Sequence, residues 1–191
     1  MELPKRLPLR NFRAGTQWMR IHNVKRPALW FGPAPGFPAT NRFDDPLGEF
    51  HVCYLGTTIQ ACFAETFLRN PPVRILTIAD LAARRIATIA LGRELRIATL
   101  YGPGAARLGT TAQLAADSRY DFSQTWSRAL WEHPDSPDGI AYRSRHDDTA
   151  LCAAIFDRAR DALTLTHDDA LGANPQLLAR LLKRYDLGLT R

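Results

Sequence analysis

One stretch of the chain, residues 41–69 with the sequence NRFDDPLGEFHVCYLGTTIQACFAETFLR, constrains the fold more than any other. Within it, Val52–Leu55 is apolar and of strand length, and Gly56 with the two threonines after it ends the strand and offers a helix N-cap. From Ile59 onward, apolar residues recur at helical spacing. The stretch therefore predicts a turn, a buried strand and an amphipathic helix in immediate succession.

Three side chains of this stretch can carry chemistry. Arg42 lies in the turn, Tyr54 on the strand, and Glu65 on the helix beside its apolar stripe. A carboxylate at that position can be half buried and still reach a cleft, so the three elements predict a cation, an aromatic ring and an anion near one another. Two plainer interpretations stay open from the residues alone: Arg42 is a solvated turn charge, and Tyr54 is a core aromatic.

A second anchor is the stretch GIAYRSRHDDTALCAAIF, residues 139–156. Residues 139–142 and 150–156 are apolar runs typical of buried strands, and Ser144 lies in the turn between them. Arg143, Arg145 and His146 surround this serine in the sequence. The stretch predicts a hairpin whose turn presents a hydroxyl among cationic side chains.

Together these anchors resemble the RES domain, the toxin half of bacterial RES-Xre toxin-antitoxin pairs, a family named for its Arg, Glu and Ser. The family's early strand, its "GRWN"-like turn, its "vlYla"-like strand, its "AllE"-like helix and its "GI-YpS" strand read here as Trp18-Met19-Arg20-Ile21, Asn41-Arg42-Phe43-Asp44, Val52 to Gly56, Ala61 to Glu65, and Gly139 to Ser144. The motifs occur in order over roughly residues 17–166.

The chain departs from the family pattern at four positions: Asn41 replaces Gly, Phe43 replaces Trp, Asp44 replaces Asn, and Arg143 replaces Pro. Asn tolerates positive φ and Phe preserves an apolar plug, so we expect the turn to keep its shape. Asp44 and Arg143 are expected to add charges near the pocket, which bears on substrate details more than on the fold.

The resemblance implies an α+β fold with a mixed or antiparallel sheet core and flanking helices, similar to ADP-ribosyltransferases, in which a split sheet surrounds an NAD cleft. It implies a toxin of a type II toxin-antitoxin system that cleaves NAD+ at the nicotinamide-ribose bond, as a phosphorylase or a glycohydrolase, depleting NAD and arresting growth. The alternative is a protein mono-ADP-ribosyltransferase that uses NAD+ as donor. Whether phosphate, water or a protein side chain is the acceptor stays open.

The resemblance also implies roles for individual residues. Breaking the nicotinamide-ribose bond builds positive charge on the ribose, which the carboxylate of Glu65 would stabilise in the transition state. Arg20 and Arg42 would hold the pyrophosphate with their forked donors. Tyr54 would stack on nicotinamide or hydrogen-bond the ribose, and Ser144 would bind that ribose or a phosphate. His146 leaves open the alternative of Ser144 as a nucleophile, although no His and Asp constellation is evident around it.

The implied partner is a cognate Xre-like, DNA-binding antitoxin, through which the chain would oligomerise. Residues 22–40 contain Pro27, Pro33, Pro35 and Pro38, so neither a central strand nor a long helix forms there. A loop of this length in a compact domain is often functional. We expect it to form a lid or wall of the pocket and to contact the antitoxin, with a passive surface loop as the open alternative.

The basic charge is concentrated near the N-terminus. Residues 1–26 carry seven basic residues and one acidic residue, which accounts for the whole formal net charge of +6. We therefore expect residues 1–16 to form a basic N-terminal arm and residues 17–191 a single domain. A nucleic-acid-binding module that uses this arm is the third function class, and the neutral charge of the remainder argues against it.

Several classes of site are not supported by the sequence. The three cysteines lie in apolar runs without CxxC spacing, which is typical of buried thiols in a reducing compartment. The histidines show no paired spacing, so no metal is expected, and neither a GxGxxG nor a GxxxxGK[ST] motif is present. Because no apolar stretch approaches the length of a membrane span, we expect a cytoplasmic protein without membrane contact.

The rest of the chain predicts a run of further elements. Strands are expected at residues 17–21, 74–78, 85–91, 95–100 and 162–166, a turn at 101–104, and helices at 124–131 and from Asn174-Pro175 onward.

Overall fold

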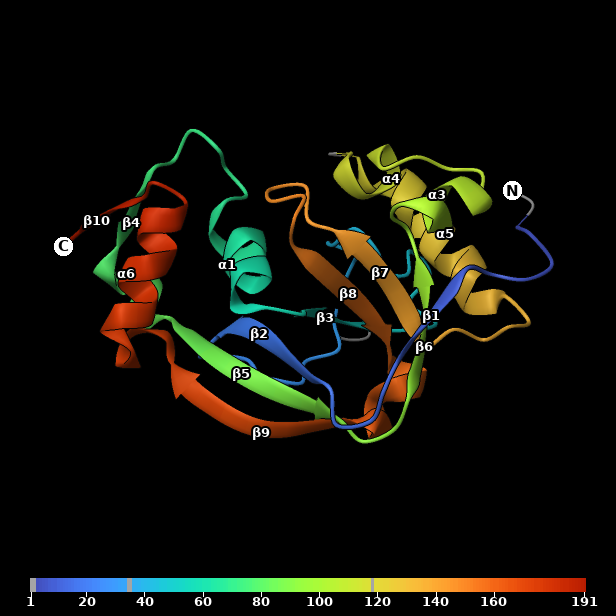
Figure 1. The fold of residues 1–191 in the computed structure, drawn as a ribbon, viewed down its shortest axis with the longest axis horizontal. Helices are drawn as coiled ribbons and strands as arrows, with labels where there is room; N and C mark the ends of the chain where they lie inside the picture. Colours follow the sequence, from blue (N-terminus) through green and yellow to red (C-terminus); the bar gives the residue numbers. More distant parts are fainter. Residues whose placement is uncertain (1–2, 34–35, 118) are drawn as a thin grey trace.

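The computed structural model describes residues 3–33, 36–117 and 119–191 (Figure 1). Its main sheet contains β1 (Leu9–Phe12), β2 (Gln17–Asn23), β3 (Val52–Gly56), β5 (Arg84–Leu91), β6 (Leu95–Thr99), β7 (Gly139–Arg143), β8 (Leu151–Phe156) and β9 (Leu163–Ala170), and a second, two-stranded sheet contains β4 (Ile75–Thr77) and β10 (Gly188–Thr190). The helices are α1 (Ile59–Phe67), α2 (Ile78–Ala82), α3 (Pro103–Arg107), α4 (Gln113–Ala116), α5 (Tyr120–Glu132) and α6 (Pro175–Arg184), with 3-10 turns η1 (Asp157–Ala162) and η2 (Leu171–Ala173).

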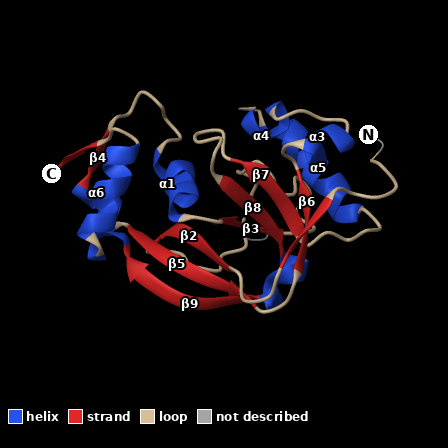
Figure 2. Ribbon diagram, in the orientation of Figure 1, coloured by secondary structure: helices blue, strands red, loops and turns tan. Residues whose placement is uncertain are grey.

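The eight-stranded sheet has the order β1-β6-β7-β8-β3-β2-β5-β9. Strands β6 and β7 run parallel, and every other neighbouring pair in this sheet is antiparallel. Helices α3, α4 and α5 lie beside β6 and β7, whereas α6 lies at the opposite end of the molecule (Figure 2). The fold is therefore α+β with a mixed sheet and flanking helices, as the sequence predicts.

The sheet is nearly divided between β2 and β3. These strands pair at one position, Met19 with Gly56, whereas β2 pairs with β5 along the seven positions from Gln17 to Asn23. Strand β3 instead pairs along its whole length with β8. Figure 1 shows β2, β5 and β9 as one band and β3, β8 and β7 as another, with α1 above the junction. The expected split sheet is present, and the split is where Arg20 and Tyr54 lie on neighbouring strands.

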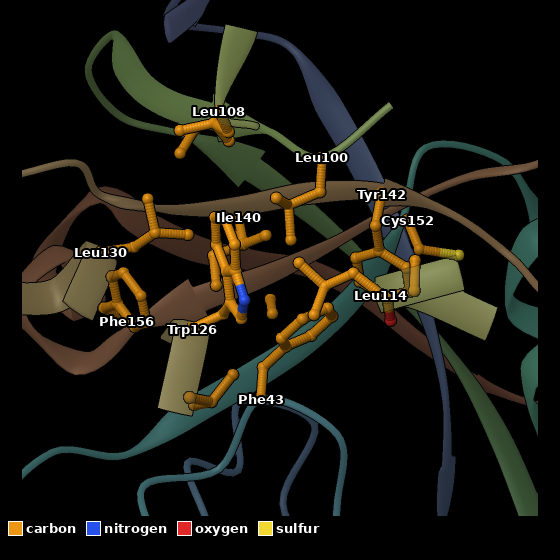
Figure 3. Close-up of a cluster of buried hydrophobic side chains, with 14 of the residues drawn as sticks. Phe43, Leu100, Leu108, Leu114, Trp126, Leu130, Ile140, Tyr142, Cys152 and Phe156 are labelled. Atoms are coloured by element: carbon orange, nitrogen blue, oxygen red, sulfur yellow. The ribbon is translucent and has the colours of Figure 1, made fainter. Parts of the chain in front are cut away.

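The largest apolar cluster packs one face of β7 and β8 against the turn after residue 40 and against α3 to α5 (Figure 3). Phe43 is fully buried in it, with its ring centroid 4.9 Å from that of Tyr142. The expected apolar plug at Phe43 is therefore confirmed. Because the turn that bears Arg42 is fixed by this plug, the position of the guanidinium follows from core packing.

The N-terminal segment differs from the expectation of a basic arm. Leu9–Phe12 forms β1, an edge strand that pairs with β6, and the ring of Phe12 packs edge-on against Trp18 at 4.9 Å. Leu7 is buried, and its backbone N–H donates to Asp135 Oδ2 at 2.8 Å. Arg10 and Asn11 are exposed between the partly buried Leu9 and the buried Phe12, which suits an edge strand with polar side chains in solvent. Deleting residues 1–16 would therefore remove an edge strand of the sheet.

Two predicted local elements also differ. The strand expected at residues 74–78 shortens to Ile75–Thr77, because Thr77 and Asp80 form a reciprocal capping box that begins α2. The turn expected at residues 101–104 includes the first residues of α3, where Pro103 occupies the first helical turn. In the described part of the chain, no helix is long and apolar enough to cross a membrane.

Candidate active site

A cavity of about 230 Å³ opens beside the split in the sheet. Its walls come from β2, β3, α1, the segment after β2, the turn after residue 40, the start of α5, and the β7–β8 loop. It brings together four of the five residues predicted from the sequence: Arg20, Arg42, Tyr54 and Glu65. These residues are spread over 46 positions of the chain, so the cavity exists only in the folded protein.

Glu65 lies in the C-terminal half of α1, and the rest of the helix is anchored by its cap and by buried residues. Thr58 caps this helix by accepting the N–H of Ala61 at 3.2 Å, and Ala61, Cys62 and Ala64 are buried against the sheet. The side chain of Glu65 is half buried and faces the cavity, where it is the one carboxylate among the described lining residues. Within the described residues it forms no ion pair and no side-chain hydrogen bond, so its oxygens are available to a ligand.

Arginines dominate the rest of the lining. Arg20, Arg26, Arg42, Arg69 and Arg145 all border the cavity. Arg26, Arg69 and Arg145 are exposed at its mouth, Arg20 is half buried, and Arg42 is buried. Five guanidinium groups around one carboxylate favour a ligand that is itself an anion, because forked donors bind phosphate oxygens in pairs.

Arg20 bridges the two halves of the sheet. It projects from β2, and its Nη1 donates to the carbonyl of Trp30 and to Cys53 Sγ, both at 2.9 Å. Trp30 belongs to the Pro-rich segment, and Arg26 stacks on its ring with 4.2 Å from the guanidinium carbon to the ring centroid. The described part of this segment therefore forms a wall of the cavity, as expected.

Arg42 is anchored on the opposite side. Its Nη1 donates to the carbonyl oxygens of Leu114 and Asp117, at 3.5 and 2.5 Å, and its guanidinium carbon lies 4.9 Å from the ring centroid of Tyr120. Burial lowers the pKa of Arg42 from its usual value. Arg42 is therefore not a solvated turn charge. Its Nη1 joins the turn to α4 and to the residue that follows it, and the residue also borders the cavity.

Tyr54 borders the cavity, and its hydroxyl already forms two hydrogen bonds within the protein, so its ring is the part left to contact a ligand. That hydroxyl donates to Asp44 Oδ1 and accepts the N–H of Phe43, each at 2.9 Å. Asp44 Oδ2 accepts the N–H groups of Thr40 and Asn41, and Asp44 is fully buried. Burial raises the pKa of Tyr54 well above its usual value. The expectation that Asp44 adds charge to the pocket is wrong, because this carboxylate is enclosed by the turn that it shapes.

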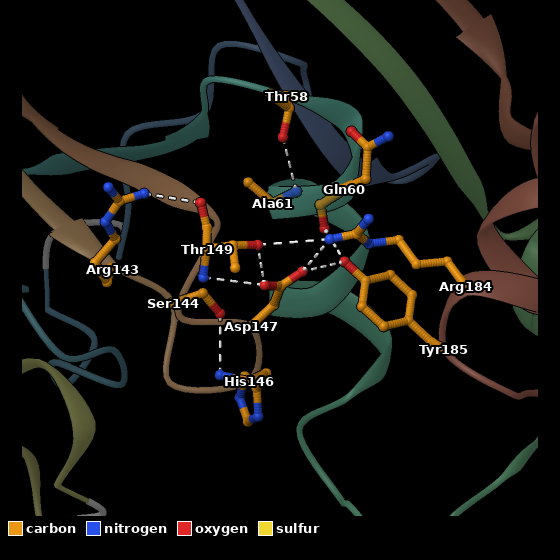
Figure 4. Close-up of polar contacts among 10 residues, drawn as sticks. All are labelled: Thr58, Gln60, Ala61, Arg143, Ser144, His146, Asp147, Thr149, Arg184 and Tyr185. Carbon is orange, nitrogen blue, oxygen red and sulfur yellow. Dashed lines mark hydrogen bonds and ion pairs between the residues drawn. The ribbon is translucent and has the colours of Figure 1, made fainter.

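Ser144 is buried and does not line the cavity. Its Oγ accepts the backbone N–H of His146 at 3.1 Å (Figure 4), so the hydroxyl shapes the turn of the β7–β8 loop. The two following residues, Arg145 and His146, line the cavity instead. Arg143 is exposed, donates to the carbonyl of Thr149, and lies outside the lining, which corrects the expectation that it adds charge to the pocket.

His146 is held as a neutral imidazole. Its Nε2 accepts a hydrogen bond from Nε of Arg145 at 3.2 Å, which places the ring proton on Nδ1. Burial lowers the pKa of His146 from its usual value. The serine hydroxyl meets the backbone of His146, so the geometry lacks the hydroxyl-to-imidazole contact that a Ser144 nucleophile requires.

Sequence reasoning missed several lining residues. Arg69 follows Glu65 by four residues, just beyond the end of α1, and this spacing could have revealed it. Tyr142 lies in the predicted strand before Ser144, where its side chain alternates with those of its neighbours. No local pattern marks Arg26 or Tyr120, because both reach the cavity through the tertiary fold.

Comparisons with known proteins identify the family of this chain. The model of the RES domain matches residues 17–174. A protein named probable toxin y4kH, from Sinorhizobium fredii (strain NBRC 101917 / NGR234), is 32% identical over 110 residues, which cover 58% of this chain and 86% of that protein. A chain in the crystal structure of the M. tuberculosis MbcT-MbcA toxin-antitoxin complex matches the fold with a TM-score of 0.67 and 19% identity, covering 91% of this chain and 92% of that one. The protein therefore belongs to the RES domain family.

Proposed function

We propose that this protein is a toxin that cleaves NAD+ at the bond between nicotinamide and ribose. The observation that carries the proposal is the half-buried carboxylate of Glu65, which has no ion-pair partner among the described residues, in a cavity bordered by five arginines. A dinucleotide offers a ligand with matching charges: a pyrophosphate for the guanidinium groups, and a ribose that becomes cationic during the reaction.

The reaction places specific demands on the cavity. When the bond breaks, its electron pair moves to the pyridinium nitrogen and leaves neutral nicotinamide, while the ribose becomes an oxocarbenium-like cation. The carboxylate of Glu65 attracts that cation more strongly than it attracts the ground-state ribose, which lowers the barrier. An acceptor with a nucleophilic oxygen or nitrogen then bonds to the same carbon and completes the transfer.

The arrangement of the arginines suggests how the substrate lies. The cavity is smaller than the roughly 300–1,000 Å³ of sites that enclose a drug-sized ligand, so it holds one end of the dinucleotide. We place the nicotinamide ribose inside, near Glu65, Arg20 and the ring of Tyr54. The pyrophosphate then lies at the mouth, where Arg69 and Arg145 are exposed. Arg42, which the sequence assigns to the pyrophosphate, would reach it only with donors other than Nη1.

The toxin assignment rests on the relatives' names. One relative is named a probable toxin, and the structural match comes from a toxin-antitoxin complex. We accordingly propose an antitoxin as partner, of the Xre-like kind that the motifs suggest, and a cytoplasmic site of action where NAD+ is abundant. Transfer of ADP-ribose to a protein side chain uses the same Glu65 chemistry and differs only in the acceptor.

The test is to incubate the purified protein with NAD+ and to quantify nicotinamide by chromatography, in buffer with and without phosphate. We expect nicotinamide release, together with free ADP-ribose if water is the acceptor or phosphorylated ADP-ribose if phosphate is. Mass spectrometry of lysate proteins incubated with the enzyme and NAD+ detects transfer to a side chain. Absence of nicotinamide release under all of these conditions would refute the proposed function.

A further inference from the structure

The β7–β8 loop is tied to the C-terminal helix on the side away from the cavity. Arg145 and His146 of this loop line the cavity, whereas the next residue, Asp147, points to the end of α6 (Figure 4). Asp147 Oδ2 accepts hydrogen bonds from the hydroxyl of Tyr185 at 2.8 Å and from Nη2 of Arg184 at 3.2 Å. Two side chains at the end of α6, Arg184 and Tyr185, therefore hold the loop through Asp147.

Tyr185 also contacts α1, the helix that carries Glu65. Its hydroxyl lies 3.2 Å from the carbonyl oxygen of Gln60, so its one proton is shared between this carbonyl and Asp147. Its ring is stacked on Phe63 of α1, with centroids 5.7 Å apart and 4° between the planes. Tyr185 is thus the one side chain in Figure 4 that touches both the loop and the Glu65 helix.

Asp147 has its hydrogen bonds satisfied and its side chain is 9% exposed. Its Oδ1 accepts the N–H and the hydroxyl of Thr149, at 3.1 and 2.5 Å, which closes the turn of the loop. Burial favours the neutral acid, but the hydrogen bonds from Thr149, Tyr185 and Arg184 outweigh it and hold the pKa of Asp147 below its usual value. The carboxylate is therefore ionised at neutral pH, and its hydrogen bonds are charge-assisted.

The helix that supplies these contacts lies beyond the family match, which ends at residue 174. Asn174 caps α6 by accepting the N–H of Leu177 at 2.9 Å, and Leu181 is buried against the cluster that includes Phe63. The end of α6 is thus fixed to the body of the protein independently of the loop. Because the end of α6 is already fixed, hydrogen bonds from it to Asp147 restrict the conformations of the loop without further ordering the helix.

We propose that Tyr185 and Asp147 form a latch through which α6 positions two walls of the cavity, the Arg145–His146 loop and the Glu65 helix, relative to each other. Tyr185 is a positioning residue, since it does not line the cavity. The catalytic consequence rests on the proposed function. If opening the latch leaves the loop in its binding geometry about one tenth of the time, the apparent affinity for substrate falls about tenfold.

The test compares Tyr185→Phe and Asp147→Asn with the wild-type protein. Tyr185→Phe keeps the ring stacked on Phe63 and removes only the hydroxyl. The matched control is Tyr101→Phe, which removes a hydroxyl that accepts from Arg10 and does not border the cavity. Amide hydrogen exchange of residues 144–150 measures the loop without any ligand, and steady-state nicotinamide release measures the cavity.

In both latch variants we expect exchange in residues 144–150 to rise about tenfold, KM for NAD+ to rise about tenfold, and kcat to change less than threefold. Because both variants break the hydrogen bond between Tyr185 and Asp147, the effect of the double variant should be smaller than the sum of the two single effects. Unchanged exchange in Tyr185→Phe, or faster exchange with unchanged KM, would overturn the latch. If the wild type releases no nicotinamide, the proposed function fails, while the exchange data still decide whether the latch restrains the loop.

Discussion

The substitution Glu65→Gln tests the role of the cavity's carboxylate. It keeps the size of the side chain and removes its charge. At a half-buried site an effective dielectric constant of about 20 applies, and a carboxylate about 4 Å from a ribosyl cation then contributes about 4 kcal/mol. Because each 1.36 kcal/mol is a factor of ten in rate, we expect kcat for nicotinamide release to fall by about 10³.

The structure also predicts what should not change. Within the described residues Glu65 has no ion pair, so Glu65→Gln should alter the free energy of unfolding by less than about 1 kcal/mol in urea titrations. The arginines remain, so KM for NAD+ should change much less than kcat. Glu94→Gln, at an exposed position outside the cavity, serves as the matched control. A Glu65→Gln variant that keeps kcat within threefold of the wild type would refute the reasoning.

Three further predictions concern the walls of the cavity. Asp44→Ala leaves the N–H groups of Thr40 and Asn41 and the buried hydroxyl of Tyr54 without their acceptor, so we expect a loss of about 3 kcal/mol in urea-measured stability; a loss below 1 kcal/mol would contradict this account. Gly56→Ala places a Cβ 2.7 Å from Cys62 Sγ and should cost about 1–3 kcal/mol, whereas an unchanged melting temperature would show that the junction of the sheet halves can relax. Burial raises the pKa of Cys62 to about 12, so at pH 8 only about one thiol in ten thousand is ionised, and iodoacetamide should label Cys62 in unfolded but not in native protein, as mass spectrometry would show.

The elements around the cavity follow from local sequence signals. The strand at residues 52–56 is an apolar run ended by a glycine, and α1 begins at a threonine cap, so the positions of Tyr54 and Glu65 could be predicted. The seven-residue pairing of β2 with β5 and the single pairing of β2 with β3 could not, because register between distant strands is set by tertiary packing. The split that opens the cavity is therefore a property of the whole sheet.

The site residues, too, include some that local sequence signals predict and some that depend on tertiary structure. Local motifs predict Arg20, Arg42, Tyr54 and Glu65 one by one, and the tertiary fold brings them together at the cavity. Ser144 does not line the cavity, because a serine in a tight turn can bond to the backbone two residues on, and sequence does not distinguish that use from ligand binding. The latch at Tyr185 was invisible for a different reason: its contacts with Gln60 and Asp147 join positions 125 and 38 residues apart.

The most direct test of the central claim is a crystal structure of the protein with a non-hydrolysable NAD+ analogue. The account predicts the nicotinamide ribose within hydrogen-bond distance of the Glu65 carboxylate, and the pyrophosphate against the guanidinium groups at the cavity mouth. An analogue bound elsewhere on the protein, or a nicotinamide ribose turned away from Glu65, would contradict it.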